Sequence, residues 1–334
     1  MEKRLNHKVI VITGASAGVG RGIAQVLAKR GAKLGLIARG EDKLESTVRE
    51  VEELGGKALA CVADVSDYDA LEEAAQKIEN KFGPIDIWIN NAMVTMLGKV
   101  QDIQPDEVKH VMDVNYMGSV NGVKIAAKRF LPRNKGHIIQ IGSALAFISI
   151  PLQSAYCASK HAVTGFLQSF RIELKIAKSK IKLTEVHLPA VNTPQFEWMK
   201  NYMPEHPMPV PPIFEPEVIG KAVSFLIDHP RRAMWVGGPT VKSILGAKFA
   251  PWIAEWKLAR SGIQSQQTEL APPTHQTNLW EPLPVDYGAT GIFDEKAKDR
   301  SWQLLFSMNR NLIAGAGVLA IGVGLFLNKK IIRG

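Results

Sequence analysis

Short apolar runs alternate along the chain with longer stretches in which apolar residues recur every three or four positions. The short runs are rich in Val, Ile and Leu, which is typical of buried strands. They lie at Val9–Thr13, Lys33–Ala38, Lys57–Cys61, Ile85–Asn90, Gly136–Gly142, Ile181–His187 and Met234–Val236. The longer stretches predict helices at Gly18–Arg30, Glu41–Leu54, Asp67–Phe82, Pro105–Asp113, Tyr116–Leu131, Ala155–Ser179 and Glu215–Asp228. This alternation predicts an α/β fold with a doubly wound parallel sheet that binds ligands at the carboxyl ends of its strands.

A proline-rich segment follows the sixth predicted strand, with six prolines between Pro204 and Pro216. Proline lacks an N–H donor and has a fixed φ, so this segment is neither a regular helix nor a central strand. Its position after a strand places it at the carboxyl edge of the sheet, above a bound ligand. We favour a substrate lid over a rigid surface connector.

Apolar residues recur at helical spacing after the last predicted strand, interrupted by Pro251: Val241, Ile244, Leu245, Phe249, Trp252, Ile253 and Trp256. The proline predicts two short helices. Three placements fit the pattern: on a membrane surface, over an apolar substrate, or simply packed on the domain, which we favour.

A second apolar run, Leu312–Leu327, contains sixteen residues and is flanked by Asn311 and Asn328. As a helix it would span about 24 Å, against about 30 Å for the hydrocarbon core of a bilayer. Lys329 and Lys330 follow it and can extend to the headgroups. We favour a single-pass tail anchor over a buried or interface helix.

The formal net charge of the 334-residue chain is +9. Residues 301–334 carry +4 of this with no acidic residue, around the apolar run, which favours a membrane flank. Neither a block of five basic residues nor a zinc-finger spacing occurs, so no motif supports a nucleic-acid partner. The eight histidines lack paired ligand spacing, and we expect no metal.

Only Cys61 and Cys157 are cysteines, which is typical of reduced thiols in a cytosolic domain. The N-terminus, Met1–Lys8, is too polar for a signal peptide. We therefore expect a catalytic domain in the cytoplasm that is associated with a membrane through its tail.

A glycine-rich turn, Thr13–Gly20, joins the first strand to the first helix. Glycines let a backbone approach a pyrophosphate closely, and free N–H groups at a helix N-terminus face the anion. The turn predicts a Rossmann-type dinucleotide-binding fold, with the cofactor held by Gly14, Ser16, Gly18, Val19 and Gly20.

The second strand ends in Ala38-Arg39, where an acidic residue would select the free ribose hydroxyl of NAD. A guanidinium suits a 2′-phosphate instead. Arg39 therefore favours NADP over NAD.

Tyr156 and Lys160 are four residues apart in a helical stretch and so share one helix face. An ammonium about 4 Å from the phenol would favour the phenolate by about 4 kcal/mol, about three pKa units. With the positive charge of an oxidised nicotinamide, we expect a phenol tuned to near pH 7 that exchanges a proton with a carbonyl oxygen. Ser143, at the end of the fifth strand, can reach the same oxygen.

The sequence resembles the short-chain dehydrogenase/reductase family over roughly residues 6–240. The matching motifs, in family order and spacing, are Thr13–Gly20, Asp64-Val65, Asn90-Asn91-Ala92, Asn115, Ser143 and Tyr156 with Lys160. The resemblance implies that Tyr156 is the acid/base, that Lys160 lowers its pKa and binds the nicotinamide ribose, and that Ser143 orients substrate. It further implies a water-holding role for Asn115, adenine contacts for Asp64 and Val65, and support beside the cofactor from Asn91. Homo-oligomers are common in the family, but nothing in the sequence fixes their number.

Two positions depart from the family pattern. Met93 and Ala190 stand where the family usually has glycine, and they put cofactor affinity in doubt more than chemistry. Thr193 remains where a hydroxyl can bond the nicotinamide carboxamide.

We therefore expect an NADP(H)-dependent oxidoreductase acting on a secondary alcohol or ketone, with a lipophilic substrate as a hypothesis. The alternative is a membrane-tethered NADP-binding regulatory or scaffold protein without turnover. The expected organisation is a catalytic domain at 1–250, an extension or linker at 251–302 that packs on or trails from it, and an anchor segment at 303–334.

Overall fold

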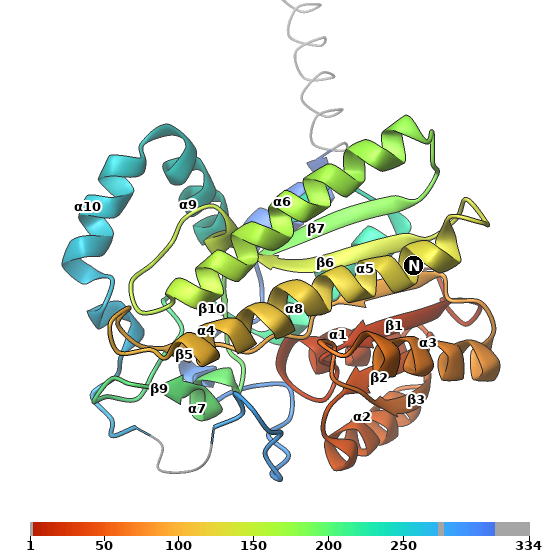
Figure 1. The fold of residues 1–334 in the computed structure, drawn as a ribbon, viewed down its shortest axis with the longest axis horizontal. Coiled ribbons are helices and arrows are strands. Elements are labelled where there is room, and N and C mark those ends of the chain that lie inside the picture. Colours follow the sequence, from red (N-terminus) through yellow and green to blue (C-terminus); the bar gives the residue numbers. More distant parts are fainter. Residues whose placement is uncertain (1–2, 273–276, 311–334) are drawn as a thin grey trace, which may run out of the picture.

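The computed structural model describes residues 3–272 and 277–310. Seven parallel strands form one sheet in the order β11-β7-β6-β4-β1-β2-β3 (Figure 1). Their bounds are β1 Val9–Thr13, β2 Lys33–Ala38, β3 Lys57–Val62, β4 Ile87–Asn90, β6 His137–Ser143, β7 Lys182–Leu188 and β11 Ala233–Trp235. The order reverses between β1 and β4, and ligands bind at such a point in open α/β sheets. The predicted doubly wound parallel sheet is confirmed.

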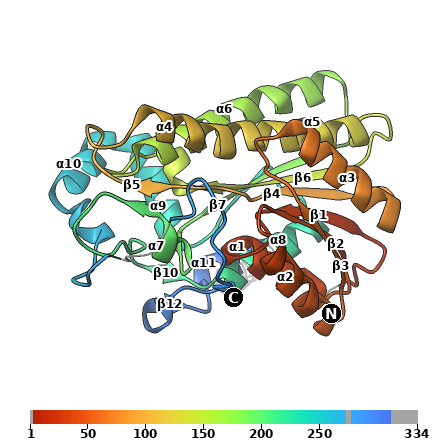
Figure 2. The ribbon, with the colours of Figure 1, turned by 60° about the horizontal axis from the view of Figure 1, so that its bottom comes forward.

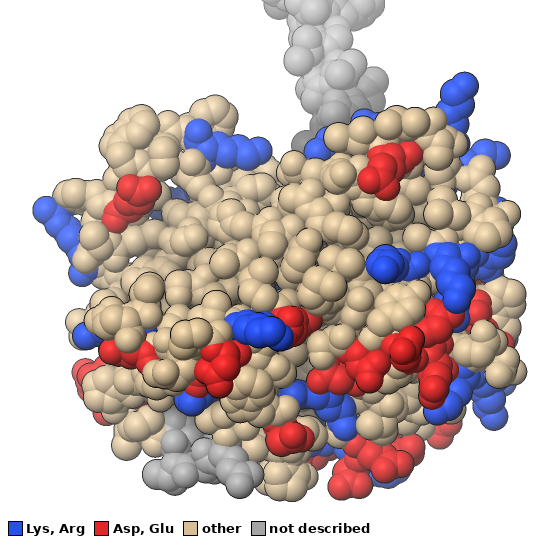
Figure 3. Space-filling view, in the orientation of Figure 1, with Lys and Arg blue, Asp and Glu red and all other residues tan. Residues whose placement is uncertain are grey.

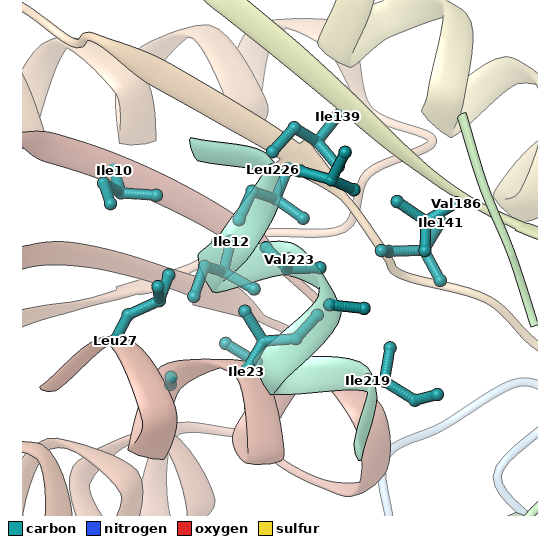
Figure 4. Packing of buried hydrophobic residues seen from close by; sticks show 14 of the residues in the cluster. Ile10, Ile12, Ile23, Leu27, Ile139, Ile141, Val186, Ile219, Val223 and Leu226 are labelled. Atoms are coloured by element: carbon teal, nitrogen blue, oxygen red, sulfur yellow. The ribbon is translucent and has the colours of Figure 1, made fainter. Parts of the chain in front are cut away.

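Helices cover both faces of this sheet (Figure 2). One face carries α1 Gly18–Ala28, α2 Glu41–Glu53 and α8 Pro216–Asp228; the other carries α3 Tyr68–Phe82, α4 Pro105–Met112, α5 Gly118–Phe130 and α6 Ser154–Ile176. All five residues of β1 are buried, because a central strand needs apolar side chains on both faces. Figure 4 shows Val223 and Leu226 of α8 packed between the sheet and α1.

The helices α4 and α5 form one continuous path through a π-helical turn, Asp113–Met117. The sequence predicts two helical stretches here, ending at Asp113 and resuming at Tyr116. The structure has no break because the Gly118 N–H donates to the Asp113 carbonyl, a bond one residue longer than in an α-helix. Such wide turns occur frequently at functional sites.

Shorter elements gather beyond the carboxyl edge of the sheet. β5 Met96–Leu97 pairs with β9 Lys200–Asn201, and β10 Ile213–Phe214 lies between β8 Ala190–Val191 and β12 Ala297–Lys298. The helices here are α7 Gln195–Trp198, α9 Gly238–Phe249 and α10 Pro251–Ser261, whereas α11 Trp302–Met308 packs Leu304 into the apolar cluster that contains α8. Pro251 begins α10, so the prediction of two short helices divided at this proline is confirmed.

The extension packs on the domain instead of trailing from it. Leu279, Leu283 and Phe293 are buried, and Leu279 belongs to the apolar cluster that contains α3, α5 and α6. None of the helices within residues 3–272 and 277–310 has the length and apolar character of a bilayer-crossing segment. The run Leu312–Leu327, predicted as an anchor, lies outside the described residues.

Charged side chains of both signs lie together over α3 and α5, whereas the surface over α6 in the same view is largely uncharged (Figure 3). On α5, Arg129 pairs with Glu72 at 2.8 Å and with Glu79 at 2.9 Å, joining it to α3. The charged groups on this face therefore hold two neighbouring helices together.

Candidate active site

A cavity of about 1000 Å³ opens at the carboxyl edge of the sheet, at the switch between β1 and β4. It is lined by groups that follow β1, β2, β3, β4, β6 and β7, because parallel strands all end at this edge. Among the predicted site residues it contains Gly14, Ser16, Gly18, Val19, Arg39, Asp64, Val65, Asn91, Ser143, Tyr156, Lys160 and Thr193. Gly20 and Asn115 are not among the residues that line the cavity.

The glycine turn is packed so tightly that side chains would not fit. Gly14 has φ +65°, and a Cβ there would lie 2.7 Å from Ala92 Cα. A Cβ on Gly20 would lie 2.1 Å from the Gly14 carbonyl oxygen. Asn91 Nδ2 donates to the carbonyls of Thr13 and Gly14 at 3.0 and 3.1 Å, which fixes the turn against the end of β4. These glycines allow the backbone of the turn to line the cavity.

Arg39 lies at the end of β2, as predicted, but its guanidinium has partners from a distant part of the chain. Nη1 donates to the Trp280 carbonyl at 2.5 Å, and Nη2 donates to the Asn278 carbonyl at 2.8 Å. Burial lowers the pKa of Arg39 below its ordinary value, although Asp64 and Glu281 oppose the shift. An arginine remains charged at neutral pH, so a cation faces this end of the cavity.

The two residues after β3 have different surroundings. Asp64 accepts hydrogen bonds from the backbone N–H and the hydroxyl of Ser66, at 2.8 and 2.7 Å. Val65 is buried, and a Cβ on Gly118 would lie 2.5 Å from it. The loop after β3 is thereby held against the start of α5.

Tyr156 and Lys160 share one face of α6, and both line the cavity. The Lys160 Nζ atom lies 5.4 Å from the centre of the Tyr156 ring and donates to the Ile141 carbonyl at 3.4 Å. Tyr156 shares a hydrogen bond with Ser143, which ends β6. The structure therefore brings these three predicted residues together.

The pKa of Tyr156 differs from the sequence expectation. Burial raises the pKa of this phenol to about 12, and its hydrogen bond with Ser143 only partly opposes the shift. Burial also lowers the pKa of Lys160 to about 8. In the chain alone, the loss of hydration therefore moves the pKa of the phenol away from the value near 7 that is expected with an oxidised nicotinamide bound.

Asn115 is buried in the π-helical turn and does not line the cavity. Its amide donates to the Val94 carbonyl at 2.9 Å and accepts from the Val94 N–H at 2.8 Å. It also donates to the Ser159 hydroxyl at 3.1 Å. Asn115 thus connects the segment after β4 to the helix that carries Tyr156 and Lys160.

Both departures from the family pattern lie at the cavity wall. Met93 follows β4, and Ala190 begins β8. Thr193 stands beside Gly18, where a Cβ on the glycine would be 3.3 Å from the threonine side chain. In the described residues, no group of three His, Cys, Asp or Glu side chains is arranged to hold a metal ion.

Other parts of the cavity wall come from elements that the site prediction did not include. Met208–Pro212 of the proline-rich segment, α9, α10 and α7 contribute to it, as do Asn278, Pro282 and Leu283 of the extension. The proline content and the apolar stripe were signals for the first three. The sequence carries no comparable signal for Asn278–Leu283, since this segment has the composition of a loop.

Known proteins share this chain's sequence and fold. The profile of the short chain dehydrogenase family matches residues 8–201. The oxidoreductase YxnA of Bacillus subtilis, itself uncharacterized, is 32% identical over 84% of this chain and 79% of its own. Rat dehydrogenase/reductase SDR family member 7B is 38% identical over 54% of this chain and 57% of its own. Since residues 1–250 make up about three quarters of the chain, the match to YxnA includes part of the extension.

Two solved structures are similar at the level of the fold. An alcohol dehydrogenase from Thermococcus sibiricus, complexed with 5-hydroxy-NADP, has a TM-score of 0.60 and 27% identity over 69% of this chain and 94% of its own. A short chain dehydrogenase from Mycobacterium paratuberculosis, bound to NAD, has a TM-score of 0.61 and 30% identity over 70% and 96%. The chain is therefore an oxidoreductase that belongs to the short-chain dehydrogenase/reductase family.

Proposed function

We propose that the protein transfers a hydride between NADP(H) and a secondary alcohol or ketone, with Tyr156 as the proton donor and acceptor. One observation carries this proposal. Tyr156, Ser143 and Lys160 meet in the same cavity that the glycine turn and Arg39 line. A proton-transfer group and a dinucleotide-binding turn in one cavity are what such a reaction requires.

The residues present fit a nicotinamide dinucleotide. The cavity runs from Arg39, past the glycine turn, to Lys160 and Thr193. Its chemistry changes along this path, from a guanidinium, through backbone close to a helix N-terminus, to an ammonium and a hydroxyl. Such donors suit, in the same order, a phosphate, a pyrophosphate, and the ribose and nicotinamide carboxamide. The reduced nicotinamide supplies a hydride when it is bound, and its oxidised form supplies a positive charge.

Arg39 and the lack of an acidic residue at the end of β2 support NADP over NAD. The similar structures were solved with either cofactor, so the preference depends on this chain's own residues. Asp64 and Val65 would line the adenine, and Asn91 holds the turn. Lys160 would bind the nicotinamide ribose.

The chain's own groups move the proton. With its pKa raised to about 12, Tyr156 is protonated at neutral pH and can donate to a carbonyl oxygen during reduction. Ser143, hydrogen-bonded to Tyr156, can hold the same oxygen. In the reverse direction the phenol must first lose its proton, which positive charge near its ring favours. Lys160 supplies such charge from 5.4 Å, and Asn115 positions the helix that carries both residues.

The lining of the substrate half supports a lipophilic substrate. Leu145, Ile148, Met199, Met208 and Val210 face the cavity beside Tyr156. Apolar walls favour ligands that lose little hydration on binding. The segment Pro204–Pro216 would act as the lid over this substrate.

The test is NADPH oxidation by the full chain across a panel of carbonyl compounds. We expect turnover, and faster turnover with steroid-type or acyl-type ketones than with short polar ketones. A preference for short polar ketones would contradict the lipophilic substrate. NADPH binding without turnover on any carbonyl would favour a membrane-tethered binding module instead.

We further propose that Leu312–Leu327 anchors the chain in a membrane and leaves the catalytic domain in the cytoplasm. The sixteen apolar residues and the two lysines after them support this.

A further inference from the structure

One segment of the extension passes the cofactor part of the cavity, and its residues Asn278, Pro282 and Leu283 line the cavity wall. We call residues Asn278–Asp294 the strap. Its first residues contact Arg39 at the end of β2, its middle reaches α1 and the glycine turn, and its last residues reach Asn192, which follows β8. Figure 1 shows this part of the chain in blue, passing between α7 and α2. The strap therefore contacts, in chain order, residues at or next to those proposed to hold the 2′-phosphate, the pyrophosphate and the nicotinamide end.

Both ends of the strap are fixed by burial. Leu279 is fully buried, its carbonyl is hydrogen-bonded to His110 at 2.8 Å, and the Trp280 ring stacks on His110 with centres 4.3 Å apart. At the other end, Asn192 donates to Asp294 at 2.6 Å, and Phe293 is buried. These contacts belong to the packed domain and should open only when the domain unfolds.

The middle of the strap buries little apolar surface: Tyr287 meets Trp198 edge-to-face with ring centres 5.0 Å apart, and polar contacts hold the residues beside it. Val285 is 54% exposed, and its neighbours Pro284 and Asp286 are exposed as well. Arg21 donates to Asp286 at 2.5 Å, and the Gly18 N–H donates to the Gly288 carbonyl at 3.1 Å. A segment with few buried contacts between two fixed ends can open locally at a modest free-energy cost.

Asp286 is the central contact of this middle part. Its partner Arg21 has only 3% of its side chain exposed, and the same guanidinium is bonded to Glu50 and Ser46 of α2. Burial alone would raise the pKa of Asp286, but hydrogen bonds from Arg21 and Ser46 hold it below its ordinary value. Asp286 is therefore a carboxylate that ties the strap to α1 and α2 at neutral pH.

The strap contacts the same groups that the proposed function assigns to the cofactor. Arg39 uses two of its five N–H donors on the carbonyls of Trp280 and Asn278, which leaves three for a phosphate. One guanidinium can therefore hold the strap and the 2′-phosphate together. Since Asn278, Pro282 and Leu283 also line the cavity, a dinucleotide there would lie against the strap.

We propose that the strap retains the cofactor and that Asp286 is the positioning residue that holds the strap closed, so that strap opening sets the rate of cofactor exchange. This inference rests on the proposed function. It predicts slow dissociation of NADPH and a cofactor-dependent protection of residues 282–290.

The test measures the dissociation rate constant of NADPH from the full chain by stopped-flow fluorescence, for the wild type and Asp286→Asn. We expect about a tenfold rise in this rate constant, because a charge-assisted hydrogen bond is lost. Arg21 keeps Glu50 and Ser46 in the variant, so we expect the thermal unfolding midpoint to change little. Asp299→Asn is the matched control, since that side chain is 79% exposed and pairs with its neighbour Arg300. It should leave the rate constant unchanged.

Ser46→Ala gives a milder second variant, because it removes one hydrogen bond to Asp286 and leaves the ion pair. We expect a smaller rise in the same direction. Hydrogen exchange provides a readout independent of turnover: bound NADPH should slow exchange at residues 282–290 in the wild type, and less so in Asp286→Asn.

Equal dissociation rates for the wild type and both strap variants would overturn the proposed role of the strap while leaving the proposed function intact. Unchanged exchange at residues 282–290 on NADPH binding would overturn it as well. A wild-type chain that binds neither NADPH nor NADH would contradict the proposed function itself, and the strap inference with it.

Discussion

At the scale of single residues, our proposal gives Arg39 two partners: the strap and the 2′-phosphate of NADP. Its position at the end of β2 was predictable from the sequence. The residue at this position distinguishes the two ribose forms. Its bonds to Trp280 and Asn278 were not, since they join residues about 240 positions apart. Substitution of Arg39 should therefore affect both the strap and the 2′-phosphate, and an experiment must separate the two effects.

The ratio of KM values for NADPH and NADH separates them. In Arg39→Asp we expect this ratio to rise at least tenfold, because only NADPH carries the phosphate that loses a charge-assisted partner. Asp286→Asn is the control, since loosening the strap should change both KM values by similar factors. If Arg39→Asp leaves the ratio unchanged, the NADP assignment fails.

Tyr156 shows what sequence spacing can and cannot predict. The spacing of four residues correctly places Tyr156 and Lys160 on one face of α6. It does not report the loss of hydration, which raises the pKa of the phenol to about 12 and lowers that of Lys160 to about 8. Burial depends on the whole fold around the pair, so its effect on the two pKa values became visible only in the structure.

At the scale of elements, the strands of the main sheet were predictable because each is a buried apolar run with turn residues at its ends. The short strands β5, β8, β9, β10 and β12 were not, since two residues carry no periodicity. The strap was missed for a related reason. Its prolines, glycines and polar residues are typical of a linker, and it is held against the domain by tertiary contacts such as those of Leu279, Asp286 and Phe293.

A buried histidine links β6, β7 and the segment before β11. His137 Nε2 lies 2.8 Å from the Thr184 hydroxyl, which donates to the Arg231 carbonyl at 2.6 Å. Because the hydroxyl proton is used on Arg231, the imidazole donates through Nε2–H. Burial, assisted by Lys182, lowers the pKa of His137 to about 4. The neutral ring is therefore the form that the fold stabilises.

This lowered pKa predicts a pH dependence of stability. The unfolded chain takes up a proton at this histidine near pH 6.5 and the folded chain only near pH 4, so stability is full above pH 6.5 and falls as the pH drops toward 4. Between these values His137 should contribute a slope of up to about 1.4 kcal/mol per pH unit.

Urea unfolding from pH 7 to 4 measures this slope. We expect a shallower slope in His137→Gln than in the wild type, and no change in His161→Gln, whose side chain lies on the exposed surface of α6. Identical slopes for the wild type and His137→Gln would show that this imidazole is not held neutral.

At the scale of the whole molecule, one α/β domain carries the site, and the extension is folded back over it. The net charge of +9 then has two roles in our proposal: Arg39 and Lys160 face an anionic cofactor, and the last residues accompany a membrane anchor. The proposed anchor, Leu312–Leu327, lies outside the described residues.

Removing residues 311–334 tests the anchor and keeps the described residues through Arg310 in the chain. The cut leaves Leu304, which is buried, and Ser307, which accepts from Arg231 at 2.8 Å. We expect the full chain to partition with membranes and the shortened chain to remain in the aqueous fraction with its carbonyl reduction intact. Membrane partitioning that survives the deletion would rule out Leu312–Leu327 as the anchor.

The most direct test of the central claim is the effect of Tyr156→Phe on turnover. This change removes the phenolic proton and keeps the ring against Lys160, so we expect kcat for carbonyl reduction with NADPH to fall at least about a hundredfold. NADPH binding should remain close to that of the wild type, and Tyr68→Phe, on α3, should behave as the wild type. A Tyr156→Phe variant that retains wild-type turnover would contradict the assignment of Tyr156 as the proton donor.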